Sequence, residues 1–233
     1  MRSSESEKEG AGRAALAEVT SGMTLGLGTG STVRFFLESL GEALSSGRIR
    51  DVRGVATSRD TETRCALLGI PVVELDDGVE LDLSVDGADE VSPSLDLVKG
   101  LGGALLRERI VVQAARRFVV VVDSAKEVAA LGEKVPVPVE VLPFGWRSHL
   151  SFFRALGADP CPREGPDGEL ARTDNGNYLV DLRFFPRIPD PERLERELRG
   201  RAGVVGTGLF LQVADRVLVG TVGGVVARER RPA

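Results

Sequence analysis

Apolar residues in the first half of the chain form short runs that alternate with stretches of helical periodicity. Strands are predicted at 23–28, 52–56, 71–75 and 118–122, of which the first is buried and the last is apolar throughout, and a strand of alternating apolar and polar residues at 81–86. Helices are predicted at 31–44, 60–68 and 102–117, with Ser31 as the first N-cap and Gly69 ending the second helix. Strands that alternate with helices predict an α/β domain with a mainly parallel sheet.

The pattern changes after about residue 131, where prolines punctuate an extended segment. We predict a helix around 150–156, a polar loop at 160–167, a strand at 177–184 and a charged helix at 191–198. Two apolar strands, at 209–213 and 217–222, are expected to rejoin the first domain. The predicted fold is therefore a Rossmann-like domain, formed by 1–131 plus 204–233, with a second, smaller α+β domain at 132–203.

Composition narrows the function classes. Hydrophobic residues make up 42% and charged residues 28%, which is typical of an ordered globular protein. The net charge of -5 gives no sign of a nucleic-acid partner. The single histidine, His149, excludes a His-cluster metal site, and Cys65 and Cys161 lie in no CxxC motif, which favours a cytoplasmic location. The N-terminus is polar and the longest apolar run is short, so no membrane association is expected.

Polar or glycine-containing segments follow four of the predicted strands, at 28–32, 57–60, 86–90 and 123–126. Ligands of open α/β sheets bind beyond the carboxyl ends of the strands, so these segments predict one polar cleft. The alternative is that loops between strands and helices are polar in any protein.

The segment Thr29, Gly30, Ser31 and Thr32 suits an anion, because glycine permits close approach and the following helix offers free N–H groups. No Gly-Lys-Ser/Thr follows, so this is not a Walker A motif. Ser31 takes the third glycine position of a dinucleotide fingerprint, which argues against a nicotinamide-dependent oxidoreductase. A tight turn without a ligand is the alternative.

Asp86 and Asp89 flank Gly87 and Ala88, and two carboxylates so close together suit either a metal ion or proton transfer. Lys99, in the glycine-rich segment 99–103, would keep them ionised or stabilise an oxyanion. A surface turn with solvated charges is the alternative.

Glu108 has apolar neighbours three and four positions away on its predicted helix. Such surroundings raise the pKa of a carboxyl group and suit a general base. Arg107 and Arg109 have similar neighbours, so pairing of Glu108 with one of them is equally compatible with the sequence.

Seven motifs occur in an order that resembles ribose-5-phosphate isomerase of the A type, over nearly the whole chain. They are the segments 26–32, 86–90, 97–108, 123–126, 138–141, 173–177 and 203–210. One departure is visible: Leu101 interrupts a glycine run that is unbroken in many members.

The resemblance implies roles for individual residues. The catalytic set would be Glu108 as proton acceptor with Asp86, Asp89 and Lys99. Substrate would be bound by the loop residues Thr29, Gly30, Ser31, Thr32, Gly87, Ala88, Gly100, Leu101 and Gly102, together with Lys126 and Lys8. Three of the four lysines of the chain thus fall on functional positions.

The implied reaction interconverts D-ribose 5-phosphate and D-ribulose 5-phosphate through a cis-enediolate, in the non-oxidative pentose phosphate pathway. Neither a cofactor nor a metal is expected, the partner is a small sugar phosphate, and the assembly would be a homodimer or homotetramer. A ligand-sensing domain without chemistry is the main rival, although it would lack the base that Glu108 supplies.

Overall fold

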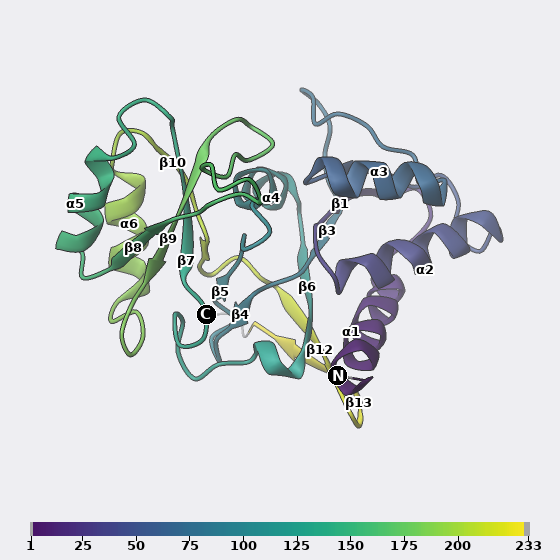
Figure 1. Ribbon diagram of the computed structural model, residues 1–233. Coiled ribbons are helices and arrows are strands. Elements are labelled where there is room, and N and C mark those ends of the chain that lie inside the picture. The colour runs from purple at the N-terminus through teal and green to yellow at the C-terminus, as the bar shows by residue number, and fades with distance from the viewer. Residues whose placement is uncertain (1, 231–233) are drawn as a thin grey trace. The chain divides into compact units, whose positions relative to one another are not determined.

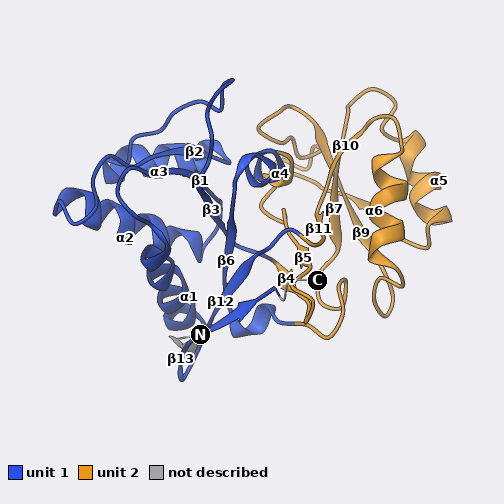
Figure 2. Ribbon diagram, turned by 180° about the vertical axis from the view of Figure 1, so that it is seen from behind, with its two compact units in different colours: residues 1–88, 107–127, 213–233 blue, residues 89–106, 128–212 orange. Residues whose placement is uncertain are grey.

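The computed structural model describes residues 2–230, which divide into two compact units (Figure 2). Unit 1 comprises 1–88, 107–127 and 213–233, and unit 2 comprises 89–106 and 128–212. The domain boundaries predicted from the sequence are different from these. The prediction placed 89–106, 128–131 and 204–212 in the first domain. Backbone pairing explains the difference: these segments hydrogen-bond with strands and loops of unit 2, as in the bond from Val128 N–H to Val91 C=O.

Unit 1 contains a six-stranded sheet in the order β13-β12-β6-β3-β1-β2. The strands are β1 (Thr24–Leu27), β2 (Arg53–Ala56), β3 (Leu83–Asp86), β6 (Phe118–Asp123), β12 (Arg216–Thr221) and β13 (Gly224–Glu229). All neighbouring pairs are parallel except β12 with β13, and Leu25 lies opposite both Gly54 and Leu83. The predicted parallel sheet is confirmed, with an antiparallel edge added.

Helices cover both faces of this sheet (Figure 1). One face packs against α1 (Arg2–Ala14), α2 (Val33–Ser45) and α3 (Arg59–Leu68), and the core there includes Phe36, Leu40 and Cys65. On the other face, Val111 of α4 (Leu105–Ala114) packs with Val55 and Leu81. This layering confirms the Rossmann-like expectation. Two short 3-10 helices, η1 (Ala15–Glu18) and η2 (Ser124–Lys126), complete the unit.

Several local predictions for unit 1 were wrong. The first of the predicted helices begins at Val33, with Thr32 rather than Ser31 as its N-cap residue. The strand predicted at 71–75 is absent, and that segment makes only an isolated β-bridge at Val72. The helix α1 was not predicted from the sequence, because its apolar stripe is narrow. β3 is buried along its whole length, Ser84 and Asp86 included, so its alternation does not mark a solvent-facing side.

Unit 2 contains an antiparallel sheet in the order β10-β7-β9-β8. Its strands are β7 (Val137–Val141), β8 (Asp159–Pro162), β9 (Tyr178–Arg183) and β10 (Val204–Thr207), and α5 (Ser148–Ala155) and α6 (Pro191–Arg199) both lie on one side of it (Figure 1). Val139, Phe153 and Leu198 belong to the core of this unit. The strand β8 corrects the prediction of a loop from 160, because its prolines sit on an edge strand where fewer N–H donors are needed.

A three-stranded sheet of short strands completes unit 2. It consists of β4 (Glu90–Val91), β5 (Leu97–Val98) and β11 (Leu209–Phe210), all antiparallel. β11 was expected to rejoin the first domain together with β12, and only β12 does so. Two-residue strands show no periodicity, so the sequence pattern could not predict them.

Candidate active site

Four predicted loops lie at one edge of the unit 1 sheet. β6, β3, β1 and β2 are consecutive parallel strands, so their carboxyl ends share an edge. The segments 28–32, 57–60, 86–88 and 123–126 therefore emerge side by side, as the sequence predicts. Asp89 and Glu90, which complete the third segment, belong to unit 2.

Asp86 is the most constrained residue of this edge. It is fully buried, and its Oδ1 atom accepts hydrogen bonds from the backbone N–H of Thr29 at 3.0 Å and of Gly87 at 2.7 Å. The carboxylate lies directly against Gly28, where a Cβ atom would overlap Oδ1 and Cγ of Asp86. Glycine at position 28 therefore lets the first loop approach the Asp86 carboxylate.

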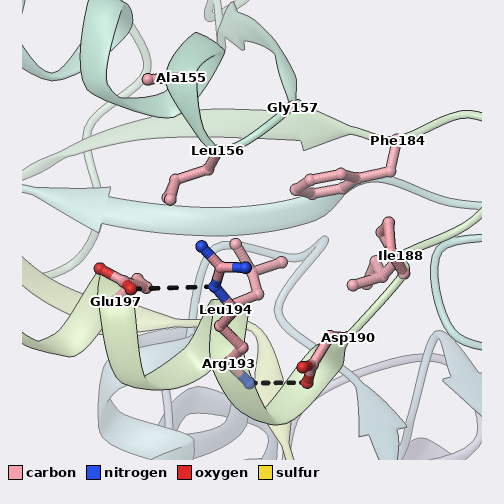
Figure 3. Close-up of a pocket in the computed structure, with 10 residues that line it drawn as sticks. Ala155, Leu156, Gly157, Phe184, Ile188, Asp190, Arg193, Leu194 and Glu197 are labelled. Atoms are coloured by element: carbon pink, nitrogen blue, oxygen red, sulfur yellow. Dashed lines mark hydrogen bonds and ion pairs between the residues drawn. The ribbon is translucent and has the colours of Figure 1, made fainter.

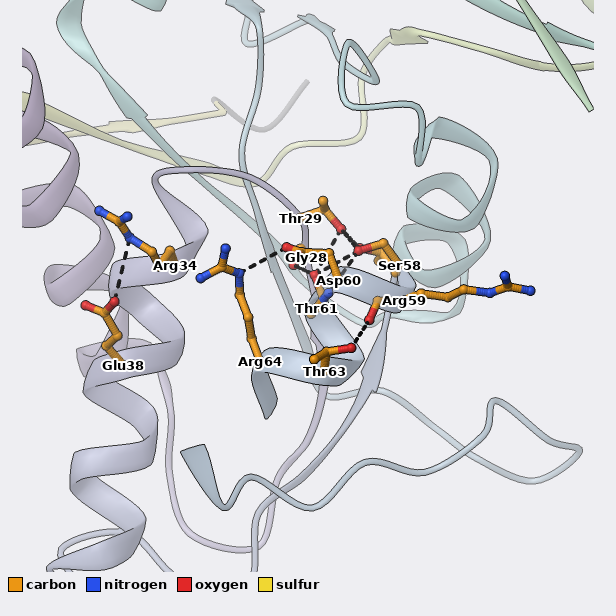
Figure 4. Close-up of polar contacts among 11 residues, drawn as sticks. Gly28, Thr29, Arg34, Glu38, Ser58, Arg59, Asp60, Thr61, Thr63 and Arg64 are labelled. Atoms are coloured by element: carbon orange, nitrogen blue, oxygen red, sulfur yellow. Dashed lines mark hydrogen bonds and ion pairs between the residues drawn. The ribbon is translucent and has the colours of Figure 1, made fainter. Parts of the chain in front are cut away.

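Thr29 supports the site from within the protein. Its hydroxyl lies 2.8 Å from the hydroxyls of Thr57 and Ser58 and 3.1 Å from that of Thr61, and Thr61 in turn donates to the carbonyl of Gly28 (Figure 4). Because its N–H bonds to Asp86, both polar hydrogens of Thr29 are used inside unit 1. These bonds fix the loop from within unit 1, and the substrate contact of Thr29 that the resemblance implies stays a prediction.

Gly30 and Ser31, which follow Thr29, are more accessible. Gly30 has a φ of 126° and is exposed, as is Ser31, whereas Thr32 is buried and makes no side-chain cap hydrogen bond at the start of α2. The positive φ at Gly30 explains the need for glycine there. Hydroxyl groups beside the N–H groups of a first helical turn form a suitable environment for an anion.

Lys8 and Lys126 come to the end of β6 from distant parts of the sequence. Lys8 Nζ lies 4.0 Å from Oδ2 of the buried Asp123, the last residue of β6. The neighbouring Glu7 accepts hydrogen bonds from the N–H and hydroxyl of Ser124, at 3.2 and 2.7 Å. These bonds attach α1 to the segment that carries Lys126, so both lysines belong to the same edge of unit 1.

Glu108 lies in the first turn of α4 and is 4% exposed. It shares the buried stripe of the helix with Leu105, Val111 and Val112, whereas Ile110 is 47% exposed. Arg107 and Arg109 are half-buried. Of the three charged residues in this turn, Glu108 is the one that occupies the buried stripe.

Unit 2 carries Asp89 and Lys99 on adjacent backbone segments. Asp89 N–H donates to Val98 C=O at 2.8 Å, and the Asp89 carboxylate accepts the N–H of Leu101 at 3.0 Å. Lys99 is 2% exposed, and its Nζ lies 5.5 Å from the centre of the Phe210 ring. These contacts bring Asp89, Lys99 and the glycine-rich segment together, as predicted.

The departure at Leu101 has a structural explanation. Gly103 N–H bonds to Gly100 C=O at 2.9 Å, which closes a tight turn over residues 100–103. Gly100 and Gly103 have φ values of 90° and 88°, and Leu101 is not among the described non-glycine residues with positive φ. A leucine is therefore tolerated at this position, whereas Gly100 and Gly103 have backbone conformations that favour glycine.

Two carboxylates that lie in the motifs 86–90 and 138–141 had no role predicted from the sequence. Glu90 is fully buried and accepts three backbone N–H groups, those of Gly132, Lys134 and Val135, so this carboxylate anchors a loop of unit 2. Glu140 Oε1 likewise joins two of the recognised motifs by accepting bonds from Thr173 and Asn177. The partners are far apart in sequence, and a pattern of neighbouring residues does not reveal them.

Unit 2 also contains a cavity that lies apart from the predicted residues. A cavity of 310 Å³ in unit 2 is lined by residues of α5 and α6 together with Phe184 and Ile188, and includes none of the predicted residues (Figure 3). Within residues 2–230, no His, Cys, Asp and Glu side chains gather in a group of three or more that could hold a metal ion. No helix in that range is long and apolar enough to span a membrane.

Comparison with known proteins identifies the family. The family model of ribose 5-phosphate isomerase A (phosphoriboisomerase A) matches residues 53–224. Ribose-5-phosphate isomerase A of Gluconobacter oxydans is 47% identical, with 94% of each chain covered, and that of Thermococcus kodakarensis is 44% identical, with 97% and 99% covered.

Comparison with solved structures leads to the same family. A D-ribose-5-phosphate isomerase in complex with phospho-erythronic acid superposes with a TM-score of 0.95 at 42% identity, covering 97% of this chain and 99% of the other. Ribose 5-phosphate isomerase from Plasmodium falciparum gives a TM-score of 0.94 at 34% identity, covering 98% and 100%. Sequence and structure together show that the chain belongs to the ribose 5-phosphate isomerase A family.

Proposed function

We propose that this protein interconverts D-ribose 5-phosphate and D-ribulose 5-phosphate through a cis-enediolate. The observation that carries this proposal is the burial of Glu108 on α4 in a chain of this family, because the reaction needs one base shielded from water. Such an activity belongs to the non-oxidative pentose phosphate pathway.

The reaction moves one proton between two carbons and another between two oxygens. Glu108 takes the proton from C2 of the open-chain aldose and returns it to C1 of the enediolate. The developing negative charge on the oxygens is stabilised by the ammonium group of Lys99. Asp86 transfers the hydroxyl proton between O2 and O1. Bonds to two backbone N–H groups hold its Oδ1 in a fixed position, which suits a group that must meet a defined oxygen.

Sugar phosphates exist largely as closed rings, so an acid or base is required before isomerisation. Asp89 serves this step in our proposal, since its carboxylate is held by the Leu101 N–H beside Lys99. The N–H of the exposed Gly102, in the 100–103 turn, adds a donor for the sugar oxygens.

The phosphate group would be held by Gly30, Ser31 and Thr32, with Lys8 and Lys126 supplying positive charge. Gly87 and Ala88, directly after Asp86, would border the sugar. Holding the phosphate orients C1 and C2 relative to the base, and such orientation supplies a large part of the rate of many enzymes.

A direct assay tests the proposal. Purified protein is incubated with ribose 5-phosphate in the presence of a chelator, without added cofactor, and the products are identified by NMR. The expected result is an equilibrium mixture with ribulose 5-phosphate. A folded preparation that produces no ketose would contradict the proposal, and activity restored only by a divalent ion would overturn the metal-independent part of it.

We propose a homodimer or homotetramer in the cytoplasm, with the smaller domain (132–203) contributing contacts. Sedimentation of the purified protein tests the assembly, since a monomer at working concentration would contradict it.

A further inference from the structure

The tight turn over residues 100–103 has a central peptide that can take two orientations. In a turn closed by a bond from the fourth N–H to the first C=O, the middle peptide plane can rotate between the type I and type II arrangements. Type II requires a positive φ at the third residue. Among the described residues, the glycines with positive φ include Gly100 and Gly103 but not Gly102, so the turn does not have the type II arrangement.

Arg163 holds the carbonyl of this central peptide. Its Nη1 donates to Leu101 C=O at 2.8 Å, while Nε and Nη2 donate to the two carboxylate oxygens of Asp181 at 2.9 and 2.5 Å. The guanidinium group is planar, so a bidentate pair with Asp181 also fixes the direction of the remaining Nη1. The side chains of Arg163 and Asp181 are 19% and 20% exposed, which limits their exchange with water.

The backbone of Arg163 is anchored as well. Its N–H donates to Leu179 C=O and its C=O accepts from Ala171 N–H, both at 2.9 Å. Asp181 belongs to β9, in the interior of the four-stranded sheet. The Leu101 carbonyl is therefore held by a side chain attached to a rigid sheet.

Fixing the Leu101 carbonyl also fixes the Gly102 N–H, because the two point in opposite directions across a trans peptide. The other polar atom of Leu101, its N–H, is held by Asp89. Gly102 is exposed, and a Cβ placed on it would meet no heavy atom within 4 Å. Its N–H thus lies in a part of the turn that a ligand can approach.

We propose that Arg163, oriented by Asp181, is a positioning residue of the isomerase. It sets the Leu101–Gly102 peptide so that the Gly102 N–H is directed at an oxygen of the enediolate. If this peptide rotated, a carbonyl oxygen would replace the donor and repel the same anionic oxygen. The inference rests on the proposed function, because it takes the 100–103 turn as a substrate contact.

The test compares Arg163→Met with Arg172→Met. Arg172 belongs to the same unit and also donates to a backbone carbonyl, that of Gly176, so it is a matched control. We expect Arg163→Met to lower kcat/KM by about 10- to 100-fold, mainly through kcat, since misplaced groups cost rates of this order. Arg172→Met should stay within about twofold of the wild type.

Two inhibitors distinguish a loss of peptide orientation from a general disruption of the substrate site. The carboxylate of 4-phosphoerythronate imitates the planar enediolate, and inorganic phosphate imitates only the anchor. For Arg163→Met, the inhibition constant of 4-phosphoerythronate should rise in parallel with the loss of kcat/KM, whereas that of inorganic phosphate should not change. Equal weakening of both inhibitors would show a merely structural role and overturn the proposal.

Chemical rescue and a second variant test the same role of the guanidinium group. Millimolar guanidinium should partly restore Arg163→Ala, whereas ammonium, which lacks the planar donor arrangement, should not. Should Arg163→Met fail to fold, Asp181→Asn replaces it, because it keeps the arginine but loosens its orientation. Unchanged kcat/KM in Asp181→Asn would overturn the proposal.

A crystal structure of Arg163→Met distinguishes this inference from the proposed function. An inactive wild-type protein would refute the isomerase, yet the orientation of the Leu101–Gly102 peptide would still be visible. A rotated or doubly occupied peptide supports the positioning role of Arg163, and an unchanged peptide contradicts it.

Discussion

The Asp86 carboxylate accepts the backbone N–H of Thr29 at 3.0 Å, although 57 positions separate the two residues. This bond joins the loop after β1 to the end of β3, and it is possible only because position 28 is glycine. The proposed proton-transfer group and the proposed phosphate loop of unit 1 are thus parts of one hydrogen-bonded structure. The geometry of either part should depend on the other.

Gly28→Ala tests this dependence. The added Cβ would overlap the Asp86 carboxylate, so the loop must shift. We expect a loss of about 1–3 kcal/mol in the free energy of unfolding, as for other overpacked sites, together with a large loss of kcat/KM. Gly223→Ala is the control, since its Cβ would make only an ordinary contact at 3.8 Å. Denaturant unfolding and steady-state kinetics measure both effects, and a fully active Gly28→Ala would refute the coupling.

Asp86→Asn separates the chemistry of this residue from its packing. The amide oxygen still accepts the two N–H groups of Thr29 and Gly87, so the melting temperature should change little. Proton transfer between the substrate oxygens is lost, and kcat should fall by about 10²–10⁴-fold. Retention of wild-type kcat in a folded Asp86→Asn protein would remove Asp86 from the mechanism.

Ser31→Leu tests the phosphate loop. Bulk at this exposed position next to Gly30 should mainly raise KM, because the phosphate anchor is separate from the proposed base. Free ribose should be a very poor substrate of the wild type, since the binding energy of the remote phosphate is lost. Equal turnover of ribose and ribose 5-phosphate would be incompatible with an anchor at this loop.

The two cysteines should differ in reactivity. Burial, and secondarily Glu62, raises the pKa of the Cys65 thiol to about 11, whereas Cys161 is exposed. A thiol reagent at pH 8 should modify Cys161 in the native protein and Cys65 only after unfolding. Because the folded pKa exceeds the ordinary value of 9.0, the neutral thiol favours the folded state below pH 9, and this contribution is lost as the pH rises towards 11. Mass spectrometry of labelled peptides identifies the modified residue.

The sequence predicts the elements whose side-chain pattern is strong. The run at 118–122 is apolar at every position and corresponds to β6, and the charged helix from Pro191 corresponds to α6, with Asp190 accepting the Arg193 N–H as its cap. In both cases the pattern of neighbouring residues is enough to predict the element. The predicted helix ends were less accurate, as at Ser31, because a cap depends on backbone conformation that a pattern does not show.

Features built from distant residues could not be predicted. β4, β5 and β11 are two-residue strands that exist through pairing with one another, and Arg163 reaches Leu101 across 62 positions. For the site, the resemblance supplied the residues and their order. It did not reveal that the Thr29 hydroxyl is bound to neighbouring hydroxyls, or that α1 brings Lys8 to the end of β6.

The central claim, that Glu108 is the base, is tested most directly by solvent exchange with Glu108→Gln. The variant keeps the shape of the side chain and removes the proton acceptor, and its melting temperature should be at or above that of the wild type because a buried carboxylate is removed. Glu18→Gln is the control: it weakens the ion pairs with Arg117 and Arg216, so it should lower stability without changing kcat.

In deuterated water the wild-type protein should exchange the C2 hydrogen of ribose 5-phosphate with solvent, because an enediolate forms only by removal of that proton. Glu108→Gln should lose this exchange together with kcat, by at least about 100-fold. If a folded Glu108→Gln protein exchanges the C2 hydrogen and turns over substrate at the wild-type rate, the base is another residue and the account is contradicted.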